Sequence, residues 1–195
     1  VLLGPEKKTF RLSEGERETV AFHEAGHTVV SYISKNTTFP VKVSIMPRGK
    51  SALGFSQREM SENKLRTQNE LLDDMCVLLG GRVAEEIFCG QITTGASDDI
   101  QKLTNLAYLY VSYYGMDHRL KTFYSNLEQN NRYSEHLRKD IDSFVQEIIN
   151  SSYLKTKDIL QNNKDFVIAI KEGLIENDTL NKDDLDNIYF NLKEY

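Results

Sequence analysis

The sequence predicts a mainly α-helical domain with one small β-hairpin. Apolar residues recur at helical spacing in several long segments, whereas apolar and polar residues alternate convincingly only near residues 41–45. The 195 residues are 39% hydrophobic and 27% charged, a composition typical of soluble globular proteins. A chain of this length is long enough to bury a core of its own.

The first predicted helix begins after Ser13, with Glu16 three residues later in the pattern of a capping box. It runs to about Ser34. Its apolar positions are Val20, Ala21, Ala25, Val29 and Ile33. Most of this helix is therefore expected to be buried.

The hairpin follows. Val41, Val43 and Ile45 alternate with polar residues, Pro47-Arg48-Gly49 predicts a turn, and residues 52–56 are expected to return as a second short strand.

A long helix is predicted from about Thr67. Its apolar stripe consists of Leu72, Cys76, Leu79, Val83 and Ile87. Gly80 and Gly81 interrupt it, and two glycines cost a helix about 2 kcal/mol. Close approach of another backbone would explain them.

A loop over residues 90–95 separates this helix from the next. Ser97 is predicted to cap the next helix, which runs to about Tyr114 and ends at Gly115. Residues 117–132 are polar and predicted to be irregular.

The remaining residues, 133–195, form a C-terminal part that is predicted to be helical, with breaks near 162–163 and 177–184. The segment 1–12 has the composition of a linker, and the domain proper is expected to span 13–195, with its catalytic part at 13–116.

Composition excludes some classes of function and context. The net charge is −5 and no face is obviously basic, which argues against nucleic acid as a partner. Cys76 and Cys89 form neither a disulfide framework nor a CxxC site, so free thiols are expected. No segment is apolar enough to span a membrane and the start does not resemble a signal peptide. Because the start also lacks an initiator Met, the chain is interpreted as part of a longer protein, and any membrane anchor would lie outside this sequence.

The chemistry concentrates in the sequence HEAGH at residues 23–27. His23 and His27 are four residues apart, so they share one helix face and together can bind a zinc ion. Glu24 lies beside the first histidine, where it can act as general base on an activated water. Two histidines on a buried helix need partners, which a metal supplies. The alternative is a pair of surface histidines.

A catalytic zinc ion usually has a third protein ligand. Val30 and Ile33 exclude the metzincin extension of the motif, which requires Gly and His there. His118 and His136 are candidates, but both lie in polar segments that are predicted to be exposed.

Asp98 and Asp99 are better candidates for this ligand. Asp99 shares a helical stripe with Leu103, Leu106 and Tyr110, so it is expected to face the core. Asp98 aligns with polar positions instead. Its carboxylate would serve only the helix dipole, the alternative role for either residue.

Metal-bound histidines normally donate their second N–H to another acceptor. Glu85 and Glu86 lie on or near the apolar side of the second long helix, and either could be that acceptor. A surface salt bridge is the alternative for both.

Several motifs occur together in a known order. They are HEAGH (23–27), PRG (47–49), LGF (53–55), GGRVAEEIFCG (80–90), TTGASDDI (93–100), YGM (114–116) and LIENDTL (174–180). The chain therefore resembles, over nearly its whole length, the peptidase domain of the FtsH family of membrane-anchored AAA+ zinc metalloproteases, peptidase family M41. One departure is Lys121, where the family usually has glycine.

The resemblance implies one zinc ion held by His23, His27 and Asp99, with Glu24 as the catalytic base. It also implies that Glu85 lies close to the zinc ligands.

For the parent protein the resemblance implies a hexameric ring, either of one chain or of paralogues, which threads unfolded polypeptides with an ATP-binding module that is missing here. Residues 1–12 resemble the segment that joins the two modules. A membrane anchor outside this chain would lie in the mitochondrial inner membrane, in a plastid or in a bacterial inner membrane. The fragment itself is expected to be soluble.

The strand residues Val43, Ser44, Ile45 and Met46 are predicted to form the sheet edge on which an extended substrate pairs through its main chain. Simple core packing is the alternative for these residues.

Two other hypotheses compete with that of an active zinc endopeptidase. One is a non-catalytic ring scaffold with a relic site, although a relic is expected to lose Glu24 first. The other is a stand-alone metallopeptidase of a different clan, against which the linker-like start argues.

Overall fold

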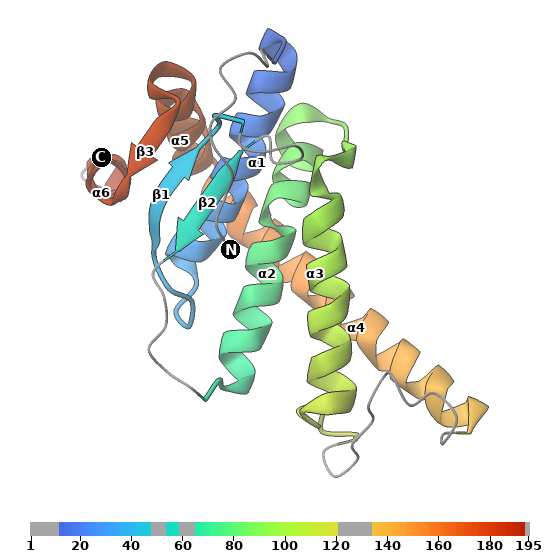
Figure 1. The fold of residues 1–195 in the computed structure, drawn as a ribbon. Coiled ribbons are helices and arrows are strands. Elements are labelled where there is room, and N and C mark those ends of the chain that lie inside the picture. The colour runs from blue at the N-terminus through green and yellow to red at the C-terminus, as the bar shows by residue number, and fades with distance from the viewer. Residues whose placement is uncertain (1–11, 48–53, 59–64, 121–133, 194–195) are drawn as a thin grey trace.

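The computed structural model describes residues 12–47, 54–58, 65–120 and 134–193, and these residues form a mainly helical fold with a small antiparallel sheet, as predicted (Figure 1). The helices are α1 (Glu14–Ile33), α2 (Gln68–Ala84), α3 (Ser97–Tyr108), α4 (Glu135–Asn162), α5 (Lys164–Asn177) and α6 (Lys182–Lys193). The strands are β1 (Pro40–Ser44), β2 (Phe55–Arg58) and β3 (Thr179–Asn181). The π-helical turns η1 (Glu85–Cys89) and η3 (Leu109–Tyr113) extend α2 and α3, and the 3₁₀ turn η2 (Thr94–Ala96) precedes α3.

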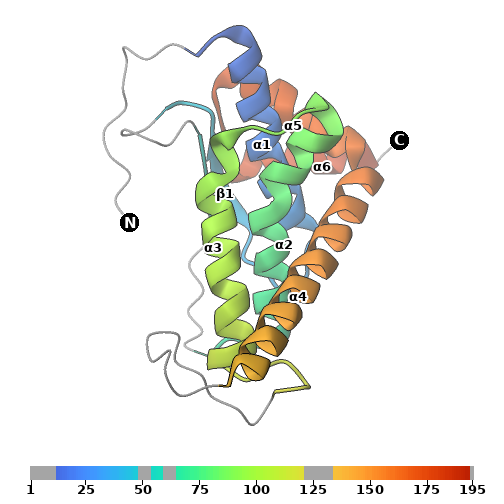
Figure 2. The ribbon, with the colours of Figure 1, turned by 90° about the vertical axis from the view of Figure 1, so that its right-hand side faces the viewer.

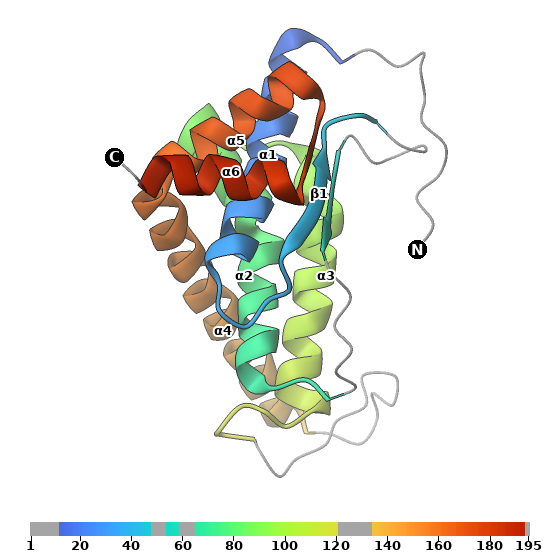
Figure 3. The same cartoon turned by 90° about the vertical axis from the view of Figure 1, so that its left-hand side faces the viewer.

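Helix α1 is the centre of the molecule. Its capping box is present as predicted: the Ser13 hydroxyl accepts from the N–H of Glu16, and the Glu16 carboxylate accepts from the N–H of Ser13. Every residue from Val20 to Ser31 is buried. Helices α2, α3 and α4 cover one side of α1 (Figure 2), and α5, α6 and the sheet cover the other (Figure 3).

Glycines let α1 and α2 cross at backbone contact. A methyl carbon at Gly26 would lie 2.3 Å from the carbonyl oxygen of Gly80 and 2.6 Å from Cβ of Ala84. A methyl carbon at Gly80 would lie 2.8 Å from the carbonyl oxygen of Gly26. The predicted reason for glycine inside α2 is confirmed at Gly80.

The sheet has the order β2-β1-β3, and this corrects the prediction for residues 43–46. Val43 pairs with Ser56 on one side and with Leu180 on the other, so β1 is the central strand. Within the described residues, β2 and β3 are the edges. The sequence does not predict β3, which occupies the expected break near 177–184.

The start of α3 also differs from the prediction. Its N-cap position is Ala96 rather than Ser97, and no side chain caps it. Thr93 caps the preceding turn η2 instead, because its hydroxyl accepts from the N–H of Gly95. The sequence pattern did not reveal this turn, which directly precedes α3.

Several predictions concern residues outside the described ones. These are most of the linker (1–11), the hairpin turn at 48–49, the first part of the returning strand (52–53) and most of the loop at 117–132. Cys76 and Cys89 are free thiols, as expected. None of the described helices combines the length and apolarity that crossing a membrane requires.

Candidate metal centre

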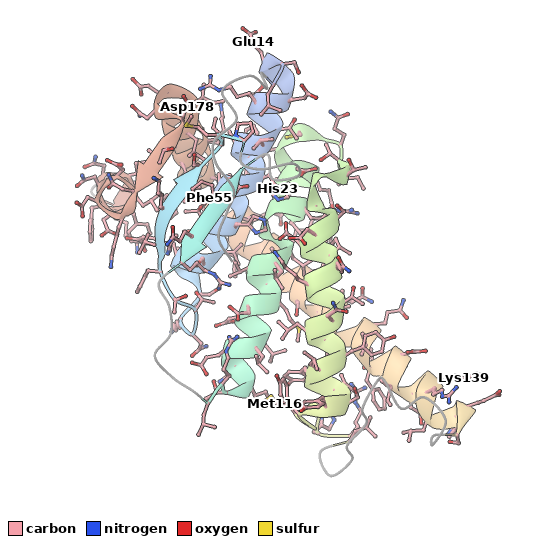
Figure 4. All side chains as sticks on the ribbon, in the orientation of Figure 1. Glu14, His23, Phe55, Met116, Lys139 and Asp178 are labelled. Carbon is pink, nitrogen blue, oxygen red and sulfur yellow. The ribbon has the colours of Figure 1, made fainter. Side chains whose placement is uncertain are left out.

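Three side chains from two helices converge at the centre of the molecule. His23 and His27 lie one turn apart on α1, and Asp99 lies in the first turn of α3 (His23 is labelled in Figure 4). The two Nε2 atoms are 3.0 Å apart. Oδ2 of Asp99 lies 3.3 Å from Nε2 of His23 and 3.2 Å from Nε2 of His27.

The second nitrogen of each ring is already occupied. Nδ1 of His27 lies 2.6 Å from the carbonyl oxygen of Val77, which can only accept, so this nitrogen donates. Nδ1 of His23 lies 2.7 Å from Oε1 of Glu85 and donates to that carboxylate. In the neutral rings, both Nε2 atoms therefore present lone pairs to each other and to Asp99.

This arrangement fits a cation. Two lone pairs and a carboxylate oxygen within 3.3 Å repel one another unless positive charge lies among them. The spacing matches ligand atoms placed about 2.0–2.2 Å from a tetrahedral zinc ion, and two imidazoles with one carboxylate are a typical catalytic zinc set. Among the described residues, these three form the group that could hold a metal ion.

The electrostatics indicate the same need for positive charge. Burial lowers the pKa of His23, but hydrogen bonds to Asp99 and Glu85 outweigh burial and raise that pKa to about 10. Burial raises the pKa of Asp99, yet the hydrogen bonds from the two histidines hold it well below its usual range. A cation bound among these groups would balance the negative charge of the Asp99 carboxylate without protonation of either histidine ring.

Glu24 lies beside this group without belonging to it. Only 6% of its surface is exposed, and burial raises the pKa of its carboxyl group although both histidines act to lower it. A raised pKa suits a carboxylate that takes up and releases a proton near neutral pH.

Glu85 links helix α1 to the turn that precedes α3. It is 1% exposed; Oε1 accepts from His23, and Oε2 accepts from the N–H of Thr93 at 2.7 Å. Glu86 lies elsewhere and accepts from Tyr153 and Lys157 of α4. The structure thus distinguishes the two glutamates that the sequence left as alternatives.

The other candidates lie apart from the centre. The side chains of His118 and His136 are 85% and 89% exposed and lie near Asp117 and Asp140. Asp98 is exposed and pairs with Lys102. The structure therefore brings Asp99 to His23 and His27. It does not bring His118 or His136 there.

Three contributors were not predicted. The carbonyl of Val77 carries no sequence signal, since any residue offers one. Gly81 leaves space for the ring of His23, because a methyl carbon there would lie 2.4 Å from Nε2. Gly54 adjoins Glu24 in the same way. The glycine pair in α2 and the LGF motif were the available signals.

Comparison with known proteins identifies the family. The sequence model of peptidase family M41 matches residues 10–188. An ATP-dependent zinc metalloprotease FtsH from Rhodothermus marinus is 42% identical over 95% of this chain, and the mitochondrial ATP-dependent zinc metalloprotease FTSH 3 from Oryza sativa is 38% identical over 95%.

The mitochondrial inner membrane m-AAA protease component AFG3L2 from Mus musculus is 40% identical over 95% of the chain. The chain covers 24–28% of the length of these three relatives. It therefore belongs to peptidase family M41, the family of the FtsH peptidase domain.

Proposed function

We propose that the chain is a zinc-dependent endopeptidase domain in which His23, His27 and Asp99 hold the metal. The observation that carries this proposal is the convergence of the two Nε2 atoms and Oδ2 of Asp99 within 3.3 Å, with both Nδ1 atoms engaged elsewhere. The family and the names of the relatives support the same activity.

Zinc bound at this place would lower the pKa of a water molecule and polarise the carbonyl group of the scissile peptide. Glu24 accepts a proton from the attacking water and passes it to the leaving amine. The raised pKa of its carboxyl group makes the first transfer, the uptake of the proton from the water, easier. His23 and His27 keep fixed tautomers because Glu85 and Val77 accept from their Nδ1 atoms.

The substrate pairs with β2 in this proposal. Strand β1 is paired on both sides, so Val43 and Ser44 offer no free edge. Strand β2 follows Gly54, which adjoins the proposed base Glu24. A chain that adds a strand there is held through its main chain, which suits broad specificity.

For the parent protein we propose an ATP-dependent, membrane-anchored protease that degrades unfolded or membrane proteins. The relatives named ATP-dependent zinc metalloprotease and m-AAA protease component support this. We further propose a ring of six chains, of one kind or with a paralogue, in an organelle or bacterial inner membrane. A cleavage assay tests this assignment. The purified parent protein should cut unfolded casein into fragments only when ATP is present.

Metal removal tests the function most simply. A chelator that binds zinc but leaves Mg²⁺ with ATP should abolish casein cleavage by the full-length protein, and stoichiometric zinc should restore it, because in this proposal zinc activates the attacking water. ATP hydrolysis is the control and should continue during chelation. Cleavage that persists in protein shown to be free of zinc would contradict the proposal.

Glu85→Gln should weaken zinc binding about 10–100-fold. The carboxylate accepts from both His23 and Thr93, whereas the amide has one acceptor oxygen and would face one donor with its NH₂ group. Competition with a chromophoric chelator measures the affinity. Glu86→Gln is the matched control and should bind zinc like wild type; equal affinities in all three proteins would remove Glu85 from the site.

A further inference from the structure

Gly54 touches the proposed catalytic base. A methyl carbon at this position would lie 2.6 Å from Oε1 of Glu24 and 2.9 Å from its Cγ. Both distances are far shorter than ordinary van der Waals contact between such atoms. The residue precedes β2, which is an edge strand of the sheet that the described residues form.

Space, and not backbone conformation, requires glycine here. The described glycines with a left-handed backbone are Gly90 and Gly115. At Gly54 the backbone is one that alanine can adopt, so the methyl group would disturb only its neighbours. The three nearest of those neighbours are all atoms of the Glu24 side chain.

The Glu24 side chain has little room to yield. It is almost entirely buried and stands on α1, whose backbone is packed against Gly80 of α2. A methyl group at Gly54 must therefore shift the carboxylate or push β2 outward. Either change alters the distance between the base and a peptide that lies along β2.

A second glycine has the corresponding role for the metal. A methyl carbon at Gly81 would meet Nε2, Cε1 and Cδ2 of His23 at 2.4–2.6 Å. Gly54 and Gly81 thus border two different functional groups. Substitution at one should affect proton transfer, and substitution at the other should affect zinc binding.

We propose that Gly54 is a positioning residue whose missing side chain sets the distance between the Glu24 carboxylate and a substrate strand on β2. The inference rests on the proposed function, in which Glu24 is the base. The three atoms nearest to a methyl carbon at Gly54 belong to Glu24 and to none of the metal ligands, so we expect its effect on catalysis to be independent of metal affinity.

The test uses the full-length protein with saturating ATP, fluorescently labelled casein and elemental analysis. Gly54→Ala should keep about one zinc per chain and a KM within a few-fold of wild type, while kcat falls about 10–100-fold, as expected for a displacement of under 1 Å. Gly81→Ala should lose zinc. Gly15→Ala is the matched control, because open space surrounds Gly15, and it should behave like wild type.

The variant Glu24→Ala separates a direct clash from a general structural effect. Alanine lacks Cγ, Cδ and Oε1, the three atoms nearest to the added methyl group, so it leaves room for that group. In the Glu24→Ala protein, a further Gly54→Ala change should alter the residual kcat less than about twofold, a strong departure from additivity.

Three results would overturn the inference: wild-type kcat in Gly54→Ala, loss of zinc or of folding in that variant, or an undiminished loss of kcat when Gly54→Ala is added to Glu24→Ala. Failure of the proposed function has a different signature, because Glu24→Gln would then retain wild-type turnover whatever Gly54→Ala does.

Discussion

Glu24→Gln lowers the kcat of casein cleavage by about 10²–10⁴-fold and leaves the zinc content unchanged, because the amide cannot accept the proton of the attacking water. The change keeps the size and shape of the side chain, so the contact with Gly54 and the burial on α1 persist. Initial rates at saturating ATP and substrate measure the effect.

The control for this substitution is Glu18→Gln. Glu18 lies on the same helix but is exposed and faces Lys171 of α5, so its loss should leave kcat unchanged. Wild-type turnover in Glu24→Gln would exclude Glu24 as the base. A loss of zinc in that variant would show instead that Glu24 supports the metal.

Gly26→Ala destabilises the domain by about 3 kcal/mol, the upper end of what one added methyl group costs in a packed core. The new carbon would meet the carbonyl of Gly80 and Cβ of Ala84 below 3 Å, and neither atom belongs to a flexible side chain. Helices α1 and α2 must separate, which also moves His27 away from Val77. Urea unfolding of the zinc-free protein measures the change.

Gly15→Ala serves as the control here as well. Gly15 lies in the first turn of α1 with open space around it, so alanine should be neutral or slightly stabilising. Equal unfolding midpoints for Gly26→Ala and wild type would mean that the helices can repack without backbone contact.

The predictable parts of this protein depend on local pattern. The capping box at Ser13 locates the start of α1, since its hydrogen bonds join residues three apart. The HEAGH spacing places two histidines on one face. The stripe that contains Asp99 correctly distinguished it from Asp98 because helix geometry determines which residues face inward.

The parts that could not be predicted depend on contacts between distant residues. Strand β3 has three residues, and one of them, Leu180, is buried; its pairing with Val43 joins segments more than a hundred residues apart. Three residues are too few for an apolar-polar alternation that would predict a strand. The prediction that β1 is an edge strand was therefore wrong. The carbonyl of Val77 likewise acquires its role only when α2 crosses α1.

The central claim is that two histidines and Asp99 form a metal centre, and zinc content per chain tests it most directly. Elemental analysis of wild type and of Asp99→Ala, each loaded with zinc and then dialysed, should find about one zinc ion per wild-type chain and far less in the variant. Equal loading of both proteins would exclude Asp99 as a ligand, and wild-type protein that takes up no zinc would contradict the account altogether.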